Sequence, residues 1–113
     1  PILLDVTLPE EENQVIIDIL DRRTDGQVAF HGLMTRAAGQ QRFATVHVLV
    51  PCDWTVKRGH DYVEDLEAEL TRAVPGLRVL SHLEPDADPR SYDDQPTGAI
   101  PFDAAQTELP DDT

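Results

Sequence analysis

The sequence predicts a small α+β domain with the element order helix, strand, strand, helix, strand, followed by an acidic tail. Three observations predict this fold class. Two segments carry apolar residues three and four positions apart, three short segments are rich in apolar residues, and a run rich in prolines and acids comes last. A chain of 113 residues fits one domain, because it is too short for two independent cores.

The first helix is predicted after Pro9, in the segment LPEEENQVIIDILDRRTDG. Proline is favoured in the first helical turn, and the glutamates at positions 10–12 lie where the helix dipole favours negative charge. Arg22 and Arg23 fill the last turn, and Gly26 is expected to end the helix. The apolar stripe of this helix consists of Val15, Ile16, Ile19 and Leu20.

Two strands follow, QVAFHGLMTR and RFATVHVLV, and the intervening AAGQQ favours a hairpin. If Arg36 pairs with Arg42, one face carries only apolar pairs, which are Val28–Val50, Phe30–Val48 and Met34–Ala44. The same register places His31 opposite His47 on the other face, with Cβ atoms about 5 Å apart. Two such imidazoles either share a metal ion or stand half-exposed on a wet sheet face, and geometry alone leaves both interpretations open.

The second helix is predicted in TVKRGHDYVEDLEAELTRAV, where Thr55 caps it and Pro75 follows its end. Its apolar stripe consists of Val56, Gly59, Val63, Leu66, Leu70 and Ala73. The segment LRVLSHL is the third strand, and Pro85 ends it because proline lacks a backbone N–H. Since side chains alternate along a strand, His82 and Glu84 point to the same side.

Composition narrows the class of function. The chain has 22 acidic and 9 basic residues and a net charge of −13, which argues against nucleic acid and anionic membranes and favours cations as partners. Cys52 is the one cysteine, so no internal disulfide can form, and a buried or idle thiol is favoured over a metal ligand. No apolar run reaches the roughly 20 residues of a membrane-spanning helix, and no signal peptide is visible. Because the chain opens at Pro1 and its one methionine, Met34, lies within a strand, we expect a fragment of a longer protein.

The last part of the chain, residues 87–113, is expected to be an acidic, proline-rich, disordered tail. From Glu84 to Thr113 there are nine acidic residues, five prolines and one arginine. This composition buries too little apolar surface to offset the entropy lost on ordering. A solvated tail is therefore favoured over docking of its isolated apolar residues, which are Ile100, Phe102 and Leu109.

Five segments of residues 2–86 occur in a familiar order: LLDVTLPEEE, HGLMTR, VHVLV, GHDYVEDLEAEL and HLEP. They resemble the C-terminal cytoplasmic domain of the cation diffusion facilitators, which are divalent-metal/proton antiporters. The resemblance implies a ferredoxin-like (metallochaperone-like) αββαβ domain at residues 9–86, with a three-stranded sheet and two helices on one face. It also implies that residues 1–8 follow the transmembrane part of the same full-length protein, and that the domain forms a homodimer that binds metal at or near its interface.

The resemblance also implies a set of metal ligands. His31, His47, His82 and Glu84 match the ligand positions of the family, and His60 and Asp86 match positions that contribute in some members. Zinc is the first expectation, with Fe²⁺, Mn²⁺, Co²⁺ and Cd²⁺ as alternatives, because imidazole and carboxylate ligands accept all of them. Two residues keep an alternative role: His60 as an interface histidine paired with Glu64, and Asp86 as a solvated acid. Gly32 departs from the family pattern, which has an acidic residue after the first histidine.

The function implied is that of a cytoplasmic regulatory and dimerisation domain of an antiporter in a bacterial inner membrane, with metal binding coupled to dimer closure. The alternative is an αββαβ regulatory module that binds a small ligand or a partner and has no metal role. No enzyme is expected, because the chain has no glycine-rich phosphate loop, no Ser/His/Asp grouping and no helical histidine pair four residues apart. Dimerisation is also expected from the apolar residues predicted on the helix-free sheet face, which are Leu33, Phe43 and Leu49.

Overall fold

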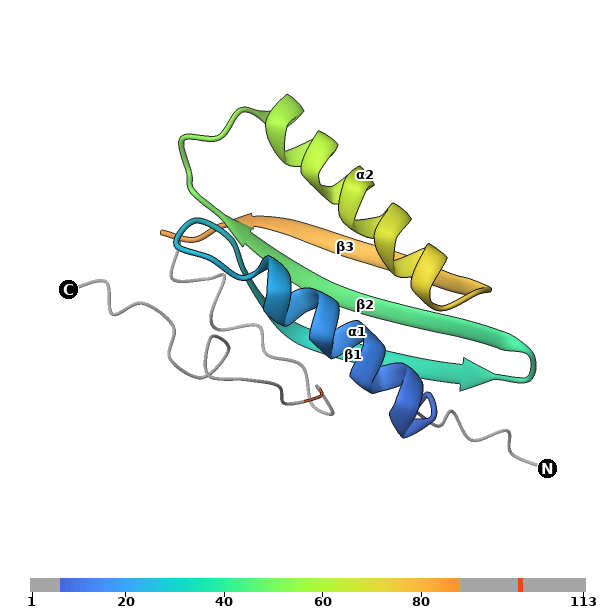
Figure 1. The fold of residues 1–113 in the computed structure, drawn as a ribbon. Helices are drawn as coiled ribbons and strands as arrows, with labels where there is room; N and C mark the ends of the chain where they lie inside the picture. Colours follow the sequence, from blue (N-terminus) through green and yellow to red (C-terminus); the bar gives the residue numbers. More distant parts are fainter. Residues whose placement is uncertain (1–6, 88–99, 101–113) are drawn as a thin grey trace.

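The computed structural model describes residues 7–87 and Ile100. The elements are α1 (Glu10–Arg23), β1 (Ala29–Ala38), β2 (Gln41–Val50), α2 (Val56–Ala73) and β3 (Leu77–Pro85). The strands form one sheet in the order β1-β2-β3, in which β1 pairs antiparallel with β2 and β3 pairs parallel with β2. Both helices lie on one face of this sheet (Figure 1). The predicted αββαβ fold is confirmed, whereas the expected disordered tail falls almost wholly outside the described residues.

The two helices begin where the sequence predicts. The carbonyl oxygen of Pro9 accepts hydrogen bonds from the N–H groups of Glu12 and Asn13, each at 3.0 Å. The Thr55 hydroxyl accepts a hydrogen bond from the N–H of Arg58 at 3.0 Å, which confirms the predicted cap of α2. Within the described residues, no helix combines the length and the apolar character that crossing a membrane requires.

Three details of the predicted helices are wrong. The first helix ends at Arg23, and Gly26 lies in the turn that follows. Val15 and Val56 were assigned to the apolar stripes, but their side chains are 38% and 86% exposed. How each helix rests on the sheet decides which residues of a predicted stripe are covered, and Ile16 and Gly59 are buried where these two valines are not.

The core lies between the helices and the sheet. Ile16, Leu20, Phe30, Leu66 and Leu70 are all at most 1% exposed and belong to one buried cluster. The helices are also joined to each other by ion pairs from Arg23 in α1 to two carboxylates of α2, Asp65 at 3.1 Å and Glu69 at 2.7 Å. Because ion pairs at this level of exposure add little stability, the apolar cluster is what fixes the helices on the sheet.

Helix α2 crosses β3 at a glycine. A Cβ atom built on Gly59 would lie 2.3 Å from Cδ2 of Leu83, so the absence of a side chain lets the helix approach the strand closely. Leu83 therefore points to the helix-covered face. Its neighbours His82 and Glu84 point to the opposite face, which we call the open face.

A β-bulge in β1 alters the predicted register. The predicted pairs Phe30–Val48 and His31–His47 are confirmed, but Met34 pairs with Thr45 and Arg36 with Phe43. The register shifts between His31 and Met34, at Gly32, whose φ of 67° is a conformation that glycine adopts at little cost. The pairings predicted beyond this point, of Met34 with Ala44 and of Arg36 with Arg42, are wrong.

The bulge also reverses the faces of the following residues. Leu33 was expected on the open face, but it is 1% exposed and belongs to the core cluster. Met34 was expected in the core, but it lines a groove with Phe43, Thr45 and Leu80. One extra residue in the strand shifts the alternation of side chains, which explains both corrections.

Candidate metal centre

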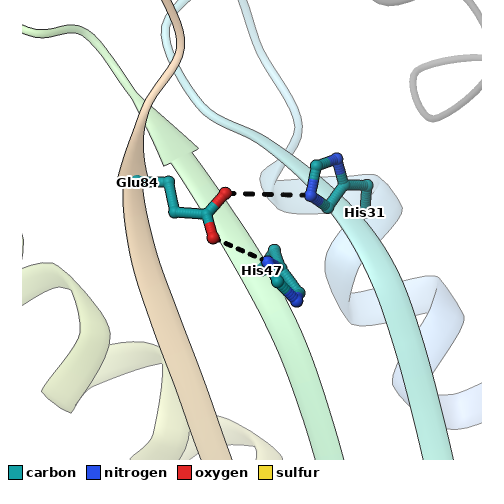
Figure 2. Close-up of side chains that lie close together, drawn as sticks. All are labelled: His31, His47 and Glu84. Atoms are coloured by element: carbon teal, nitrogen blue, oxygen red, sulfur yellow. Dashed lines mark hydrogen bonds and ion pairs between the residues drawn. The ribbon is translucent and has the colours of Figure 1, made fainter. Parts of the chain in front are cut away.

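His31, His47 and Glu84 come together on the open face, one from each strand (Figure 2). Sheet pairing places His31 opposite His47, and Glu84 is two residues beyond the partner of His47 in β3. One ligand atom from each residue lies within 4.8 Å of the other two. His47 Nδ1 is 2.8 Å from Glu84 Oε2, and His31 Nε2 is 3.9 Å from Glu84 Oε1.

The group is largely shielded from water. The side chain of His31 is 1% exposed, and those of His47 and Glu84 are 16% and 19% exposed. Leu49, which is 1% exposed, lies on the same face between the paired positions of β1 and β3. Oε1 of Glu84 is buried and has no hydrogen-bond partner among the described residues. A carboxylate oxygen in such a position is stabilised by a cation or an additional donor, because burial without either is costly.

The spacing of the donor atoms fits a small divalent ion. Zinc binds nitrogen and oxygen ligands at about 2.0–2.2 Å in a tetrahedron, so two of its ligand atoms are about 3.4 Å apart. The 3.9 Å between His31 Nε2 and Glu84 Oε1 is close to this value. The 2.8 Å contact between His47 Nδ1 and Glu84 Oε2 is a hydrogen bond, which an ion would replace. Three protein ligands would leave one position of the tetrahedron for a further ligand.

The other predicted ligands lie outside this group of three. His82 pairs with His47 in the sheet, and its exposed ring stacks on that of His47 with centroids 5.1 Å apart and planes 15° apart. His60 is exposed on α2, which covers the opposite face of the sheet. Asp86 follows β3 and donates its backbone N–H to the carbonyl oxygen of Val50 at 2.8 Å. The structure thus brings together three of the six candidates and leaves His82 in contact with them.

The fold and the site define a class, an αββαβ domain that gathers histidine and carboxylate side chains on the open face of its sheet. Comparison with known families then identifies the family to which this domain belongs. Residues 8–86 match the model of the cytoplasmic domain of cation efflux proteins. The chain belongs to this family, which confirms the resemblance to the cation diffusion facilitators.

Two curated relatives are transporters. An uncharacterised transporter of Synechocystis is 46% identical over 90 residues, which cover 80% of this chain and 29% of the relative. The cation-efflux pump FieF of Yersinia pestis is 37% identical over 83 residues, which cover 74% of this chain and 27% of the pump. The chain therefore spans less than a third of the length of the relatives it matches.

Solved structures of the same fold include a close match. The zinc form of CzrB, described as a candidate zinc transporter, is 36% identical with a TM-score of 0.66, and the match covers 75% of this chain and 97% of that one. Another CzrB structure is 38% identical with a TM-score of 0.63, covering 69% and 96% of the two chains. The C-terminal domain of CzcD from Thermotoga maritima is 21% identical with a TM-score of 0.62, covering 70% and 92%, and at this identity it supports the fold alone.

Proposed function

We propose that this chain is the cytoplasmic regulatory domain of a divalent-metal efflux transporter, and that it binds a divalent ion, zinc in the first place, through His31, His47 and Glu84. The observation that carries the proposal is the convergence of these three donor side chains, from three strands, to within 4.8 Å of one another. The relation to the FieF pump and to the zinc form of CzrB supports it. Transport itself, as an exchange of metal for protons across a bacterial inner membrane, belongs to the membrane part of the full-length protein.

Each ligand has a distinct role in this proposal. Glu84 supplies the negative charge, and the neutral imidazoles of His31 and His47 supply nitrogen ligands. His82 would supply a fourth ligand once its ring had turned away from His47, on which it stacks. His60 and Asp86 are assigned to a second ion or to an ion shared with the partner protomer, because neither belongs to the group of three among the described residues.

A calorimetric titration of the 113-residue chain with zinc at pH 7.5 tests this site. Glu84→Gln keeps the shape of the side chain and removes its charge, and His47→Ala removes a nitrogen ligand. Loss of a residue that only supports a metal ligand lowers metal affinity about 10–100-fold. Because these variants lose a ligand itself, we expect a larger loss of zinc affinity in each. His60→Ala is the matched control and should bind the first ion as the unchanged chain does. Equal affinity in the Glu84→Gln/His47→Ala double variant would exclude the site.

We further propose that the chain forms a homodimer and that metal binding favours a closed arrangement of its two protomers. Each protomer carries a net charge of −13, so mutual repulsion favours separation of the two bodies. A divalent ion near the interface reduces that repulsion and ties β1, β2 and β3 together through the site. An ion shifts such an equilibrium only by its difference in affinity for the two states, and a coupling of about 1–3 kcal/mol changes the populations about 5- to 150-fold.

Two measurements test the dimer and its closure. Sedimentation at micromolar concentration should show a dimer without metal. For closure, a nitroxide is attached at Arg72→Cys, in the last turn of α2, in a Cys52→Ser background. Zinc should shorten the distance between the labels of the two protomers when the site is unsubstituted. In the Glu84→Gln variant, zinc should not shorten this distance. A distance distribution that zinc leaves unchanged in the unsubstituted site would contradict closure, while the calorimetric result would still decide the site.

A further inference from the structure

The chain returns to the edge of the sheet at Ile100. Its backbone N–H donates a hydrogen bond of 2.6 Å to the carbonyl oxygen of Leu33, and its half-buried side chain packs against the core cluster. Leu33 lies in the bulge of β1, an edge strand of the sheet. An edge strand offers unpaired backbone groups to an approaching segment, and Ile100 uses one of them. Ile100 is therefore held at the position of β1 directly before Met34.

Met34 belongs to a groove of about 640 Å³ on the open face, at the hairpin end of the sheet. We call it the arginine groove, because Arg36 and Arg78 line it beside an apolar floor. The floor consists of Met34, Phe43, Thr45 and Leu80. The guanidinium of Arg36 lies over the Phe43 ring, 4.6 Å from its centroid, and Leu80 is 59% exposed. Within the described residues, Arg78 is exposed and forms no ion pair.

The arginine groove has the chemistry to take an acidic segment with scattered apolar residues. Residues 101–113, PFDAAQTELPDDT, are of this kind, with Asp103, Glu108, Asp111 and Asp112 as acids, Phe102 and Leu109 as large apolar residues, and no basic residue. A free acidic peptide would be repelled by a chain of net charge −13. A segment already attached through Ile100 has a high effective concentration at the groove, so weak contacts are enough to dock it.

We propose that residues 101–113 dock in the arginine groove of their own chain, with Ile100 as the anchor, Phe102 on the apolar floor and the acids against Arg36 and Arg78. The proposal does not rest on metal binding. It goes beyond the expectation of a solvated tail, because Ile100 already contacts the fold. Docking covers the part of the open face that lies next to the metal centre and keeps it from a second copy of the chain. Residues 101–113 then compete, from within the same chain, with any partner that binds this part of the open face.

A nitroxide at Ala105→Cys, in a Cys52→Ser background, tests the docking by paramagnetic broadening of amide signals in the full chain. Amides of residues 43–45 and of Leu80 should broaden strongly, and those of the exposed side of α2 should not. Ile100→Ser removes the anchor side chain and Arg78→Glu reverses one charge of the groove. Each should lower the docked population about two- to fivefold or more, as expected for weak exposed contacts. Arg72→Glu, on α2 and away from the groove, is the matched control and should leave the broadening unchanged.

Three outcomes would overturn the proposal. Equal broadening on both faces of the sheet would mean that the tail does not dock. Broadening of an unlabelled, isotope-enriched chain mixed with a labelled one would show that the tail docks on another copy. Shifts of the groove amides that depend on protein concentration, without broadening from the label, would show that a second copy covers the arginine groove.

Discussion

Gly59→Ala should destabilise the domain, although alanine is the better helix former. Gly59 is the fourth residue of α2, and replacement of glycine by alanine within a helix ordinarily stabilises it by up to about 1 kcal/mol. Here the added Cβ would lie 2.3 Å from Cδ2 of Leu83. Carbon atoms in contact are separated by about 3.5 Å or more, so Cδ2 must move by about 1.2 Å.

The magnitude depends on how Leu83 moves. Overpacking costs about 1–3 kcal/mol, and an off-rotamer side chain alone costs about 0.5–1.5 kcal/mol. Leu83 is 39% exposed, so part of its side chain can turn outward, which favours the lower half of this range. After the gain in helix propensity is subtracted, we expect a net loss of up to about 1 kcal/mol. For a domain of this size, that corresponds to a decrease in Tm of up to about 8 °C.

Urea unfolding of four chains provides the assay: the unchanged chain, Gly59→Ala, Leu83→Ala and the double variant. Without the Leu83 side chain the clash is absent, so Gly59→Ala should then stabilise the domain by up to about 1 kcal/mol. The sign of the Gly59→Ala effect should therefore reverse between the two backgrounds. Stabilisation by Gly59→Ala in the presence of Leu83 would refute the close approach of α2 and β3. Because Leu83 lies between His82 and Glu84, Gly59→Ala should also weaken zinc binding.

Three further predictions follow from single features of the structure. Gly32→Ala should destabilise the domain by about 1–2 kcal/mol in urea unfolding, because φ of Gly32 is 67°. Gly26→Ala is the control: Gly26 has no positive φ and a Cβ atom there would meet no atom within 4 Å, so this change should be neutral or slightly stabilising. Burial raises the pKa of the Tyr62 phenol, and Arg23 opposes this in part. As pH rises, Tyr62 therefore loses its proton in the unfolded chain before it does so in the folded chain. Stability should thus be complete below about pH 10 and fall as pH rises further, more than in Tyr62→Phe. Zinc affinity measured by calorimetry should fall steeply as pH decreases from about 7 to 5.5, because protons compete with zinc for imidazoles whose ordinary pKa is near 6.5. An affinity independent of pH would contradict histidine ligation.

The elements and the first part of the site could be predicted because they depend on local signals. Apolar periodicity located both helices, and Thr55 identified the start of α2. The apolar pairing of the hairpin placed His31 opposite His47, and strand alternation placed His82 and Glu84 on one side of β3. Only the resemblance to the family implied that this side joins His31 and His47. These inferences succeed because a register slip of one residue would expose a whole apolar face.

What failed depended on contacts between elements or on one backbone conformation. The exposure of Val15 and Val56 depends on how each helix rests on the sheet, which periodicity alone does not contain. Selecting Glu84 over His60 as a member of the group of three required knowledge of which face α2 covers. The bulge had a signal in the sequence, because an isolated glycine within a strand pattern indicates a bulge or a close backbone approach. That signal at Gly32 would have corrected the pairing of Met34 and Arg36.

The bulge at Gly32 is what allows one sheet face to carry two different surfaces. Without it, alternation along β1 would place Leu33 beside His31 on the open face and turn Arg36 toward the helices. With it, Leu33 fills the core, while Met34 and Arg36 line the arginine groove. His31 lies before the bulge and keeps its position opposite His47 in either case. The open face therefore has one end where the Glu84 carboxylate and the His31 and His47 imidazoles gather, and a basic, apolar end lined by Arg36 and Arg78. A residue other than glycine at position 32 would therefore act mainly on the arginine groove, so release of the tail with zinc affinity retained in the Gly32→Ala chain would show that the bulge separates the two ends of this face.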